Sequence, residues 1–286
     1  MRELRGTGVA LVTPFTNEGA VDYQGLKNLL AFTGEHVDYF VVLGTTGETA
    51  TLNKAEKAEV LAFVKENNPR KLPIVLGVGG NNTAQVILDI DYFNLDGVSA
   101  ILSVSPYYNK PSQAGIIAHY TAIADSSPLP IILYNVPGRT MSNISAETTL
   151  KLAEHKNIIG IKEACGYLEQ TGKIASGKPD DFMLISGEDL LTAPMIEQGA
   201  VGVISVLANG FPEEFCRISS MGLNKESEGA ATASSFFDTI NPLMYEESNP
   251  VGVKEVLRIK GVCGNNVRLP LLPASESLSK RISKLM

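Results

Sequence analysis

Lys162 is the side chain of this sequence best suited to covalent chemistry. It closes the run Ile158-Ile159-Gly160-Ile161, and it alone among the lysines ends a run of β-branched residues. If that run is a buried strand, burial disfavours the ammonium form and makes the free amine available to attack a carbonyl carbon. The alternative is a side chain that extends along the surface and keeps its ammonium in water.

The turn Gly44-Thr45-Thr46-Gly47-Glu48 is the second candidate, because it follows one apolar run and precedes a helical pattern. Its glycines permit a tight turn in which backbone N–H groups and two hydroxyls converge on an anion such as a carboxylate. An ordinary connection between a strand and a helix has the same appearance. The segment lacks the Gly-Lys-Ser/Thr of a phosphate loop, and residues 77–80 lack the glycine spacing of a dinucleotide site.

Three further side chains follow the ends of apolar runs. Tyr134 closes one run and Tyr108 follows another; a phenol in such a place can carry a proton, although many such tyrosines only pack. Arg139 is a permanent cation that can hold a carboxylate with two hydrogen bonds, or form a surface ion pair. An amine, hydroxyls and an anion-binding turn are typical of Schiff-base chemistry, in which a keto acid becomes an enamine that attacks an aldehyde.

Other chemistries find little support. The three histidines, His36, His119 and His155, lie far apart in helical segments without metal-ligand spacing, so we expect no metal site. Neither a nucleophile elbow nor a Ser-His-Asp order is present. Glu188-Asp189 is the only carboxylate pair after an apolar run, and we expect it to cap the following helix.

Eight short apolar runs, rich in Val and Ile, can bring these side chains together. Their starts lie roughly 20 to 34 residues apart, which leaves room for a strand, a helix and two loops. Continuous apolarity is typical of strands covered on both faces, as in parallel sheets. We therefore predict a (β/α)8 TIM barrel over residues 1–222, with a doubly wound open sheet as the alternative. The predicted strands are residues 8–13, 39–43, 73–77, 100–104, 131–135, 158–162, 182–186 and 202–206, and helices are expected to start near Asp22, Asn53, Asn82, Gln113, Ser145, Glu188 and Pro212.

The rhythm changes after residue 221. Residues 225–248, 251–262 and 272–285 predict three helices with no strand between them, and prolines mark the joints. We therefore predict a small all-helical domain over residues 223–286.

Composition narrows the possible partners. The 286 residues include 24 basic and 31 acidic side chains, a net charge of −7, so we expect neither nucleic acid nor an anionic membrane as a partner. The first residues do not form a signal peptide, and no apolar stretch of about 18 residues occurs. The three scattered cysteines favour reduced thiols, and we expect a cytoplasmic location.

Several segments, each weak alone, are specific in combination. Together they resemble the dihydrodipicolinate synthase family, in the superfamily that includes N-acetylneuraminate lyase, over nearly the whole chain. The segments are Ala-Leu-Val-Thr-Pro-Phe at 10–15, the turn at 44–48, Pro-Tyr-Tyr-Asn-Lys-Pro at 106–111, Tyr-Asn-Val-Pro-Gly-Arg-Thr at 134–140, Ile-Lys-Glu-Ala at 161–164, Ser-Gly-Glu-Asp at 186–189, Gly-Val-Ile-Ser at 202–205 and Asn-Pro at 249–250.

The resemblance implies an enzyme that condenses pyruvate with L-aspartate 4-semialdehyde to 4-hydroxy-tetrahydrodipicolinate, the first committed step toward diaminopimelate and lysine. It implies no cofactor, and a homotetramer built as a dimer of dimers. The residues carried over by motif are Lys162 for the Schiff base, Thr45, Tyr134 and the neighbouring subunit's copy of Tyr108 for a proton relay, Thr45 and Thr46 for the pyruvate carboxylate, Arg139 for the semialdehyde carboxylate, and Gly187 and the Ile204 carbonyl as pocket lining.

Two alternative functions remain at this point. Sugar-acid aldolases of the superfamily resemble the chain elsewhere, but they usually lack the arginine at 139 and often carry Ser at position 45. A small dianionic aldehyde needs that cation, whereas a polyol needs hydrogen-bonding side chains. A catalytically silent keto-acid-binding protein is the other alternative, and the intact set of reactive residues argues against it.

The resemblance also concerns regulation. Family members inhibited by lysine bind it at a dimer interface, where sensitive members often carry His at positions 54 and 57 and Glu at 85. Two lysines and a missing carboxylate disfavour an ammonium ligand, so we expect weak or absent inhibition by lysine. The corresponding residues here are Thr49, Ala50, Lys54, Lys57, Asn81, Gln85 and Tyr107.

Overall fold

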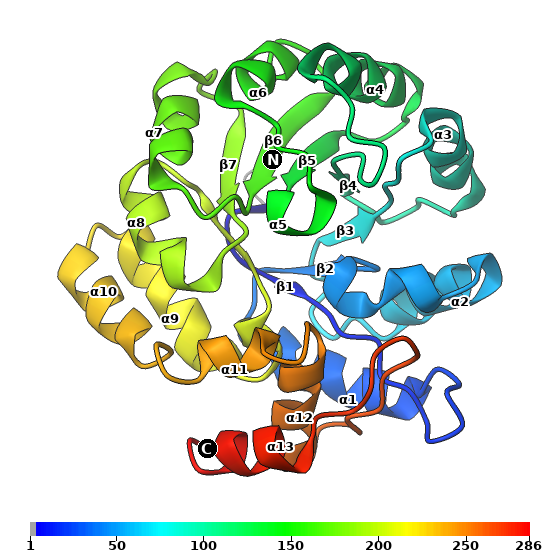
Figure 1. The fold of residues 1–286 in the computed structure, drawn as a ribbon, viewed down its shortest axis with the longest axis vertical. Helices are drawn as coiled ribbons and strands as arrows, with labels where there is room; N and C mark the ends of the chain where they lie inside the picture. Colours follow the sequence, from blue (N-terminus) through cyan, green and yellow to red (C-terminus); the bar gives the residue numbers. More distant parts are fainter. Residues whose placement is uncertain (1–3) are drawn as a thin grey trace.

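The computed structural model describes residues 4–286. Eight parallel strands close into a barrel in chain order, and β8 pairs with β1 (Figure 1). The (β/α)8 prediction is therefore confirmed, and the open sheet is wrong. The strands are β1 (Gly6–Ala10), β2 (Tyr39–Val42), β3 (Ile74–Gly77), β4 (Ala100–Val104), β5 (Ile131–Asn135), β6 (Ile158–Glu163), β7 (Met183–Ser186) and β8 (Gly202–Ser205).

The first strand differs most from its prediction over residues 8–13. Strand β1 starts at Gly6, which pairs with Gly202 of β8. Past its end, the chain stays buried without continuing the strand, and the Val12 N–H donates to the Asn209 side chain at 3.1 Å. The apolar residues after the strand belong to a buried loop, so the hydrophobic run extends past the end of β1.

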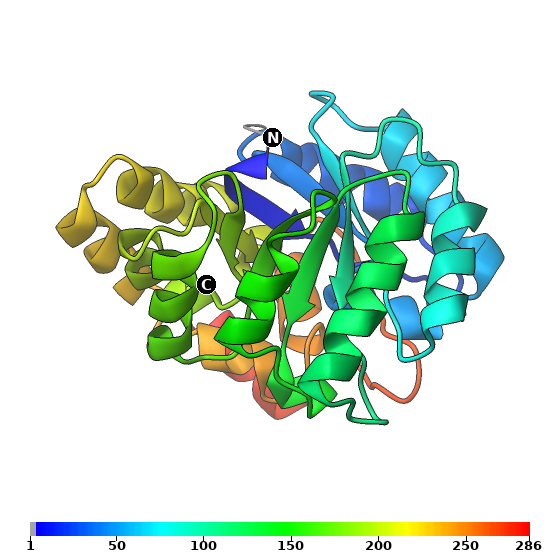
Figure 2. The ribbon, with the colours of Figure 1, turned by 90° about the horizontal axis from the view of Figure 1, so that it is seen from above.

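Helices surround the strands on the outside of the barrel (Figure 2). The predicted caps at Asp22 and Asn53 are confirmed: the first accepts from the Gly25 N–H, and the second forms a capping box with Glu56. The helices of the barrel are α1 (Tyr23–Gly34), α2 (Lys54–Glu66), α3 (Thr83–Tyr92), α4 (Gln113–Ser126), α5 (Pro137–Thr140), α6 (Ala146–Leu152), α7 (Leu168–Gly177), α8 (Thr192–Glu197) and α9 (Pro212–Leu223).

Helices α5 and α7 were not predicted from the sequence. Helix α7 follows Tyr167, whose side chain makes no capping hydrogen bond, so the usual signal of a helix start is absent. Helix α5 is a single turn, too short to show a periodic pattern. It lies over the middle of the barrel mouth in Figure 1.

The chain beyond α9 is helical, as predicted, but residues 225–248 do not form one helix. They form α10 (Ser227–Ser235) and α11 (Asn241–Tyr245), separated by a turn in which Phe237 and Ile240 are buried. Helices α12 (Val251–Ile259) and α13 (Glu276–Ser283) follow and pack against each other. The division into domains at residue 222 stays a prediction.

Two buried clusters show how the strands place their side chains. Ile132 and Tyr134 of β5 face the inside of the barrel, whereas Ile131 and Leu133 pack between the strands and the surrounding helices. Side chains thus alternate along the strand, as in any β-sheet. Within residues 4–286, every helix is too short or too polar to cross a membrane.

Candidate active site

Lys162 reaches the inside of the barrel because of an irregularity in β6. Ile131 pairs with Ile158, but the next residue of β5 pairs with Gly160, so Ile159 is an extra residue. Ile159 faces the inside of the barrel, so strict alternation from it would turn Lys162 outward. The extra residue shifts the alternation by one position, and Lys162 faces inward instead. The Lys162 side chain is consequently only 5% exposed, rather than extending into water.

Tyr134 lies beside Lys162 on the neighbouring strand. The two residues are partners in the β5–β6 register, and the Lys162 Nζ lies 4.4 Å from the centre of the Tyr134 ring. Gly187, after β7, leaves the room that the lysine needs: a Cβ at this position would lie 3.1 Å from the Lys162 Cε and 2.6 Å from the Ala164 Cβ. We therefore expect any side chain at position 187 to clash with Ala164 and to crowd Lys162.

The turn at 44–48 forms a short 3₁₀ helix, η2 (Thr45–Gly47). The Thr13 hydroxyl donates to the Gly47 carbonyl at 2.7 Å and ties the turn to the loop after β1. Thr46 is buried, and its Oγ1 accepts from the Asn249 Nδ2 at 3.0 Å. Glu48 follows in the left-handed region, with φ of 51°.

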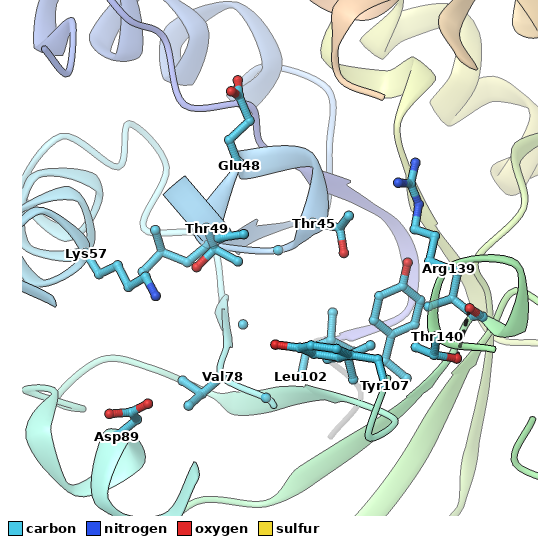
Figure 3. A pocket seen from close by; sticks show the side chains of 18 of the residues that line it. Thr45, Glu48, Thr49, Lys57, Val78, Asp89, Leu102, Tyr107, Arg139 and Thr140 are labelled. Carbon is cyan, nitrogen blue, oxygen red and sulfur yellow. Dashed lines mark hydrogen bonds between the residues drawn. The ribbon is translucent and has the colours of Figure 1, made fainter. Parts of the chain in front are cut away.

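A cavity of about 420 Å³ opens beside this turn. Thr45, Tyr134, Arg139 and Thr140 line it. Lys162 is not among the lining residues, but its Nζ lies over the ring of Tyr134, which is. Figure 3 shows Thr45 in the middle of the cavity, with Arg139 on one side and Lys57 on the other. The same cavity is lined by the residues of the expected effector site Thr49, Ala50, Lys54, Lys57 and Tyr107.

The two carboxylates after β7 do not cap the next helix with their side chains, so that expectation is wrong. Asp189 is buried and accepts from the backbone N–H groups of Val206 and Leu207 at 3.1 and 2.8 Å. Burial, and then the charge of Asp189, raise the pKa of Glu188 to about 7, while the nearby Lys162 and Arg139 act in the opposite direction.

A buried hydrogen-bond network, which was not predicted from the sequence, joins the ends of β5 and β6. The Glu163 carboxylate accepts from the side chains of Asn135 and Gln170, both at 2.9 Å, and from the Cys165 N–H at 2.8 Å. Burial raises the pKa of Glu163. An amide and an acid that end neighbouring apolar runs are the sequence signal that could have indicated this pair.

Other predicted residues also do not line the cavity, among them Tyr108, Ile204, Asn81 and Gln85. Tyr108 is 88% exposed and Ile204 is fully buried inside the barrel. Asn81 donates to the Tyr107 carbonyl at 3.1 Å. Gln85 donates to Asp89 at 2.8 Å.

Asp89 is another residue that was not predicted from the sequence. It lines the same cavity and forms an ion pair with Lys54 at 3.3 Å. The Lys54 Nζ also lies 4.1 Å from the centre of the Tyr92 ring. The region of the expected effector site thus contains a carboxylate, but this carboxylate already has a cationic partner.

Known proteins resemble the chain over its full length. Residues 3–286 match the Dihydrodipicolinate synthetase family. A 4-hydroxy-tetrahydrodipicolinate synthase of Cytophaga hutchinsonii is 49% identical over 99% of this chain and 96% of its own length, and one of Flavobacterium psychrophilum is 48% identical over 99% and 97%.

Solved structures give the same result. A monomeric dihydrodipicolinate synthase variant superimposes with a TM-score of 0.95 at 35% identity, covering 99% of this chain and 96% of the other. The enzyme from Cyanidioschyzon merolae with lysine bound superimposes with a TM-score of 0.94 at 37% identity, covering 99% and 97%.

Proposed function

The chain belongs to the dihydrodipicolinate synthetase family, and on that premise we propose that Lys162 carries the covalent step of the family's reaction. The enzyme is a carbon–carbon lyase that condenses pyruvate with L-aspartate 4-semialdehyde to 4-hydroxy-tetrahydrodipicolinate, on the route to diaminopimelate and lysine. The observation that supports Lys162 most strongly is its buried amine beside the ring of Tyr134.

The proposed chemistry starts with the free amine of Lys162. Nζ attacks the keto carbon of pyruvate and water leaves, which gives an iminium. Loss of a methyl proton then gives an enamine, whose carbon forms the new bond to the aldehyde carbon of the semialdehyde. The amino group of the semialdehyde displaces Lys162 and returns the free lysine. Tyr134 and Thr45, which line the same cavity, carry the protons.

Two carboxylates must be held during this reaction. We assign the pyruvate carboxylate to Thr45, Thr46 and the backbone of their turn, with Gly187 and Ile204 beside the pyruvate. We assign the semialdehyde carboxylate to Arg139, which α5 holds at the edge of the cavity. The cation on α5 is the feature that favours the semialdehyde over a sugar acid.

An assay of the purified enzyme separates these substrates. With pyruvate and aspartate semialdehyde we expect turnover coupled to reduction of the product. With N-acetylneuraminate or 2-keto-3-deoxygluconate we expect no cleavage. The reverse pattern would indicate a sugar-acid aldolase, and binding of pyruvate without any turnover would indicate a silent keto-acid-binding protein.

Replacing Arg139 by glutamine is expected to raise KM for the semialdehyde about 10- to 100-fold, because a hydrogen-bonded charge pair to the substrate carboxylate is lost. Pyruvate does not use this cation, so reductive trapping of pyruvate on the enzyme should be unchanged. Steady-state kinetics and trapping of the same preparation check both parts. An unchanged KM for the semialdehyde would remove Arg139 from its binding site.

For the assembly we propose a homotetramer, a dimer of dimers in which Tyr108 completes the proton relay of the neighbouring subunit. The exposure of Tyr108 in the single chain supports this arrangement, because a phenol that serves another subunit must point outward. The fold also occurs in a variant described as monomeric. A cytoplasmic location is likewise proposed, supported by three cysteines without disulfide bonds.

We expect lysine to inhibit the enzyme weakly or not at all. Lys54 and Lys57 both line the cavity where an ammonium would have to bind, and Asp89 is already paired with Lys54. The check is the initial rate of condensation at saturating substrates as lysine is added. Half-inhibition at micromolar lysine would show that the two cations do not repel the effector.

A further inference from the structure

We propose that Asn249 and Lys254, on the C-terminal helical segment, are positioning residues of the substrate-carboxylate site: they hold the 44–48 turn so that the Thr46 hydroxyl donates its hydrogen to the bound carboxylate. This inference rests on the proposed function, because it assumes that the turn binds the carboxylate of pyruvate. It adds to the site two residues that lie about 200 positions farther along the chain.

The contact between Asn249 and Thr46 determines the direction of a hydrogen bond. The Asn249 Nδ2 donates to the Thr46 Oγ1 at 3.0 Å, and both side chains are buried. A hydroxyl has one hydrogen to give. Within residues 4–286 that hydrogen finds no acceptor, so the Thr46 hydroxyl is available as a donor to an anion that enters the turn.

The side-chain oxygen of Asn249 is informative as well. Its Oδ1 is buried and has no hydrogen-bond partner among the described residues. An unsatisfied buried oxygen costs stability, and an apolar residue of similar size would avoid that cost. The amide is therefore better explained by what its Nδ2 does to Thr46 than by a contribution to stability.

Glu48 anchors the other end of the turn. Glu48 is one of the residues that line the cavity, but in Figure 3 its carboxylate points away from the other labelled side chains. The Lys254 Nζ donates to its Oε1 at 2.5 Å, and the Arg268 N–H donates to its Oε2 at 3.0 Å. Lys254 is fully buried and also donates to the Asn266 carbonyl at 2.7 Å. Glu48 thus holds the turn rather than the substrate.

Lys254 also has an electrostatic effect on the turn. Glu48 carries a negative charge within two residues of Thr46, where an incoming carboxylate would be repelled. The buried ammonium of Lys254 compensates that charge inside the protein, where solvent screens little. The C-terminal segment therefore makes the turn both rigid and able to accept an anion.

Reductive trapping of pyruvate measures the effect of Asn249 on Thr46. The measured quantity is the pyruvate concentration that gives half-maximal adduct with borohydride. We expect Asn249→Ala to raise it about tenfold and Thr46→Val to raise it at least as much. If Asn249 acts through Thr46, the double variant should be no worse than Thr46→Val alone. With saturating pyruvate, kcat should change much less than KM.

Two further variants control for damage to the fold. Asn265→Ala removes an asparagine hydrogen bond of 2.7 Å to Glu255 within the same C-terminal segment, and should leave the half-maximal concentration unchanged. Asn249→Asp keeps the size of the side chain but accepts from Thr46 instead of donating, so it should raise the concentration more than Asn249→Ala does.

Three results would overturn the inference: an unchanged half-maximal concentration in Asn249→Ala, effects of Asn249→Ala and Thr46→Val that multiply in the double variant, or pyruvate binding by Asn249→Asp equal to that of the unaltered enzyme. An unaltered enzyme that forms no pyruvate adduct at all would instead refute the proposed function.

Discussion

Replacing Lys162 by alanine is expected to lower the rate of condensation by on the order of 10⁵- to 10⁶-fold, as the loss of a covalent nucleophile does in other enzymes. The remaining residues would still bind both substrates, but no iminium could form. The coupled assay with pyruvate and the semialdehyde measures the loss. Because the side chain is buried, a thermal unfolding curve should accompany the assay to show that the variant is folded.

A neighbouring lysine provides the matched control. Lys156 is exposed and lies just before β6, so Lys156→Ala should retain the full rate. Lys162→Arg keeps a long basic side chain at this position but has no usable nucleophile, and it should be as inactive as Lys162→Ala. A Lys162→Ala rate within tenfold of the unaltered enzyme would exclude the covalent role.

Replacing Lys254 by methionine is expected to lower the free energy of unfolding by about 3–5 kcal/mol, because Glu48 is then a buried charge without its cation. Burial lowers the pKa of Lys254 and the charge of Glu48 opposes this, so the pair depends on both partners. Unfolding in urea, followed by circular dichroism, measures the change.

Two comparisons show whether the effect comes from the unpaired charge. The double variant Glu48→Gln/Lys254→Met should recover most of the lost stability, since neither charge remains. Lys280→Met removes the lysine of an exposed pair with Glu276 and should leave the unfolding curve nearly unchanged. Equal losses from Lys254→Met and Lys280→Met would show that the buried pair contributes nothing special.

The barrel was predictable because its signals are local. Apolar runs bounded by small or polar residues mark the strands, and side-chain caps such as Asp22 and Asn53 mark helix starts. Where such a local signal is absent, an element was not predicted. Helix α7, which has no side-chain cap, is an example. The prediction of a single helix over residues 225–248 was wrong, because apolarity alone does not distinguish a helix from a buried turn.

The direction of Lys162 depends on a feature that periodicity does not show. The extra residue in β6 arises from its pairing with β5, and pairing partners are distant in sequence. A count of alternating positions from Ile159 would have placed the amine outside the barrel. Its position at the end of an apolar run and the motif at 161–164 indicated a role, but neither determines which face the side chain takes.

The candidate site was predictable in part, because several of its residues follow the ends of the apolar runs. The carboxyl ends of parallel strands meet at one end of the barrel, so Thr45, Tyr134 and Arg139 could be expected to line one cavity. The contacts of Asn249 and Lys254 with the turn could not be expected from local patterns. They join residues more than 200 positions apart, and their partners follow only from the folded chain.

Borohydride reduction in the presence of pyruvate, followed by peptide mass mapping, tests the covalent role of Lys162 most directly. We predict one pyruvate-derived mass increment, on the peptide that contains Lys162, and none in Lys162→Ala. An increment on a different lysine, or an enzyme that turns over without any trapped adduct, would contradict a reaction that passes through this buried amine.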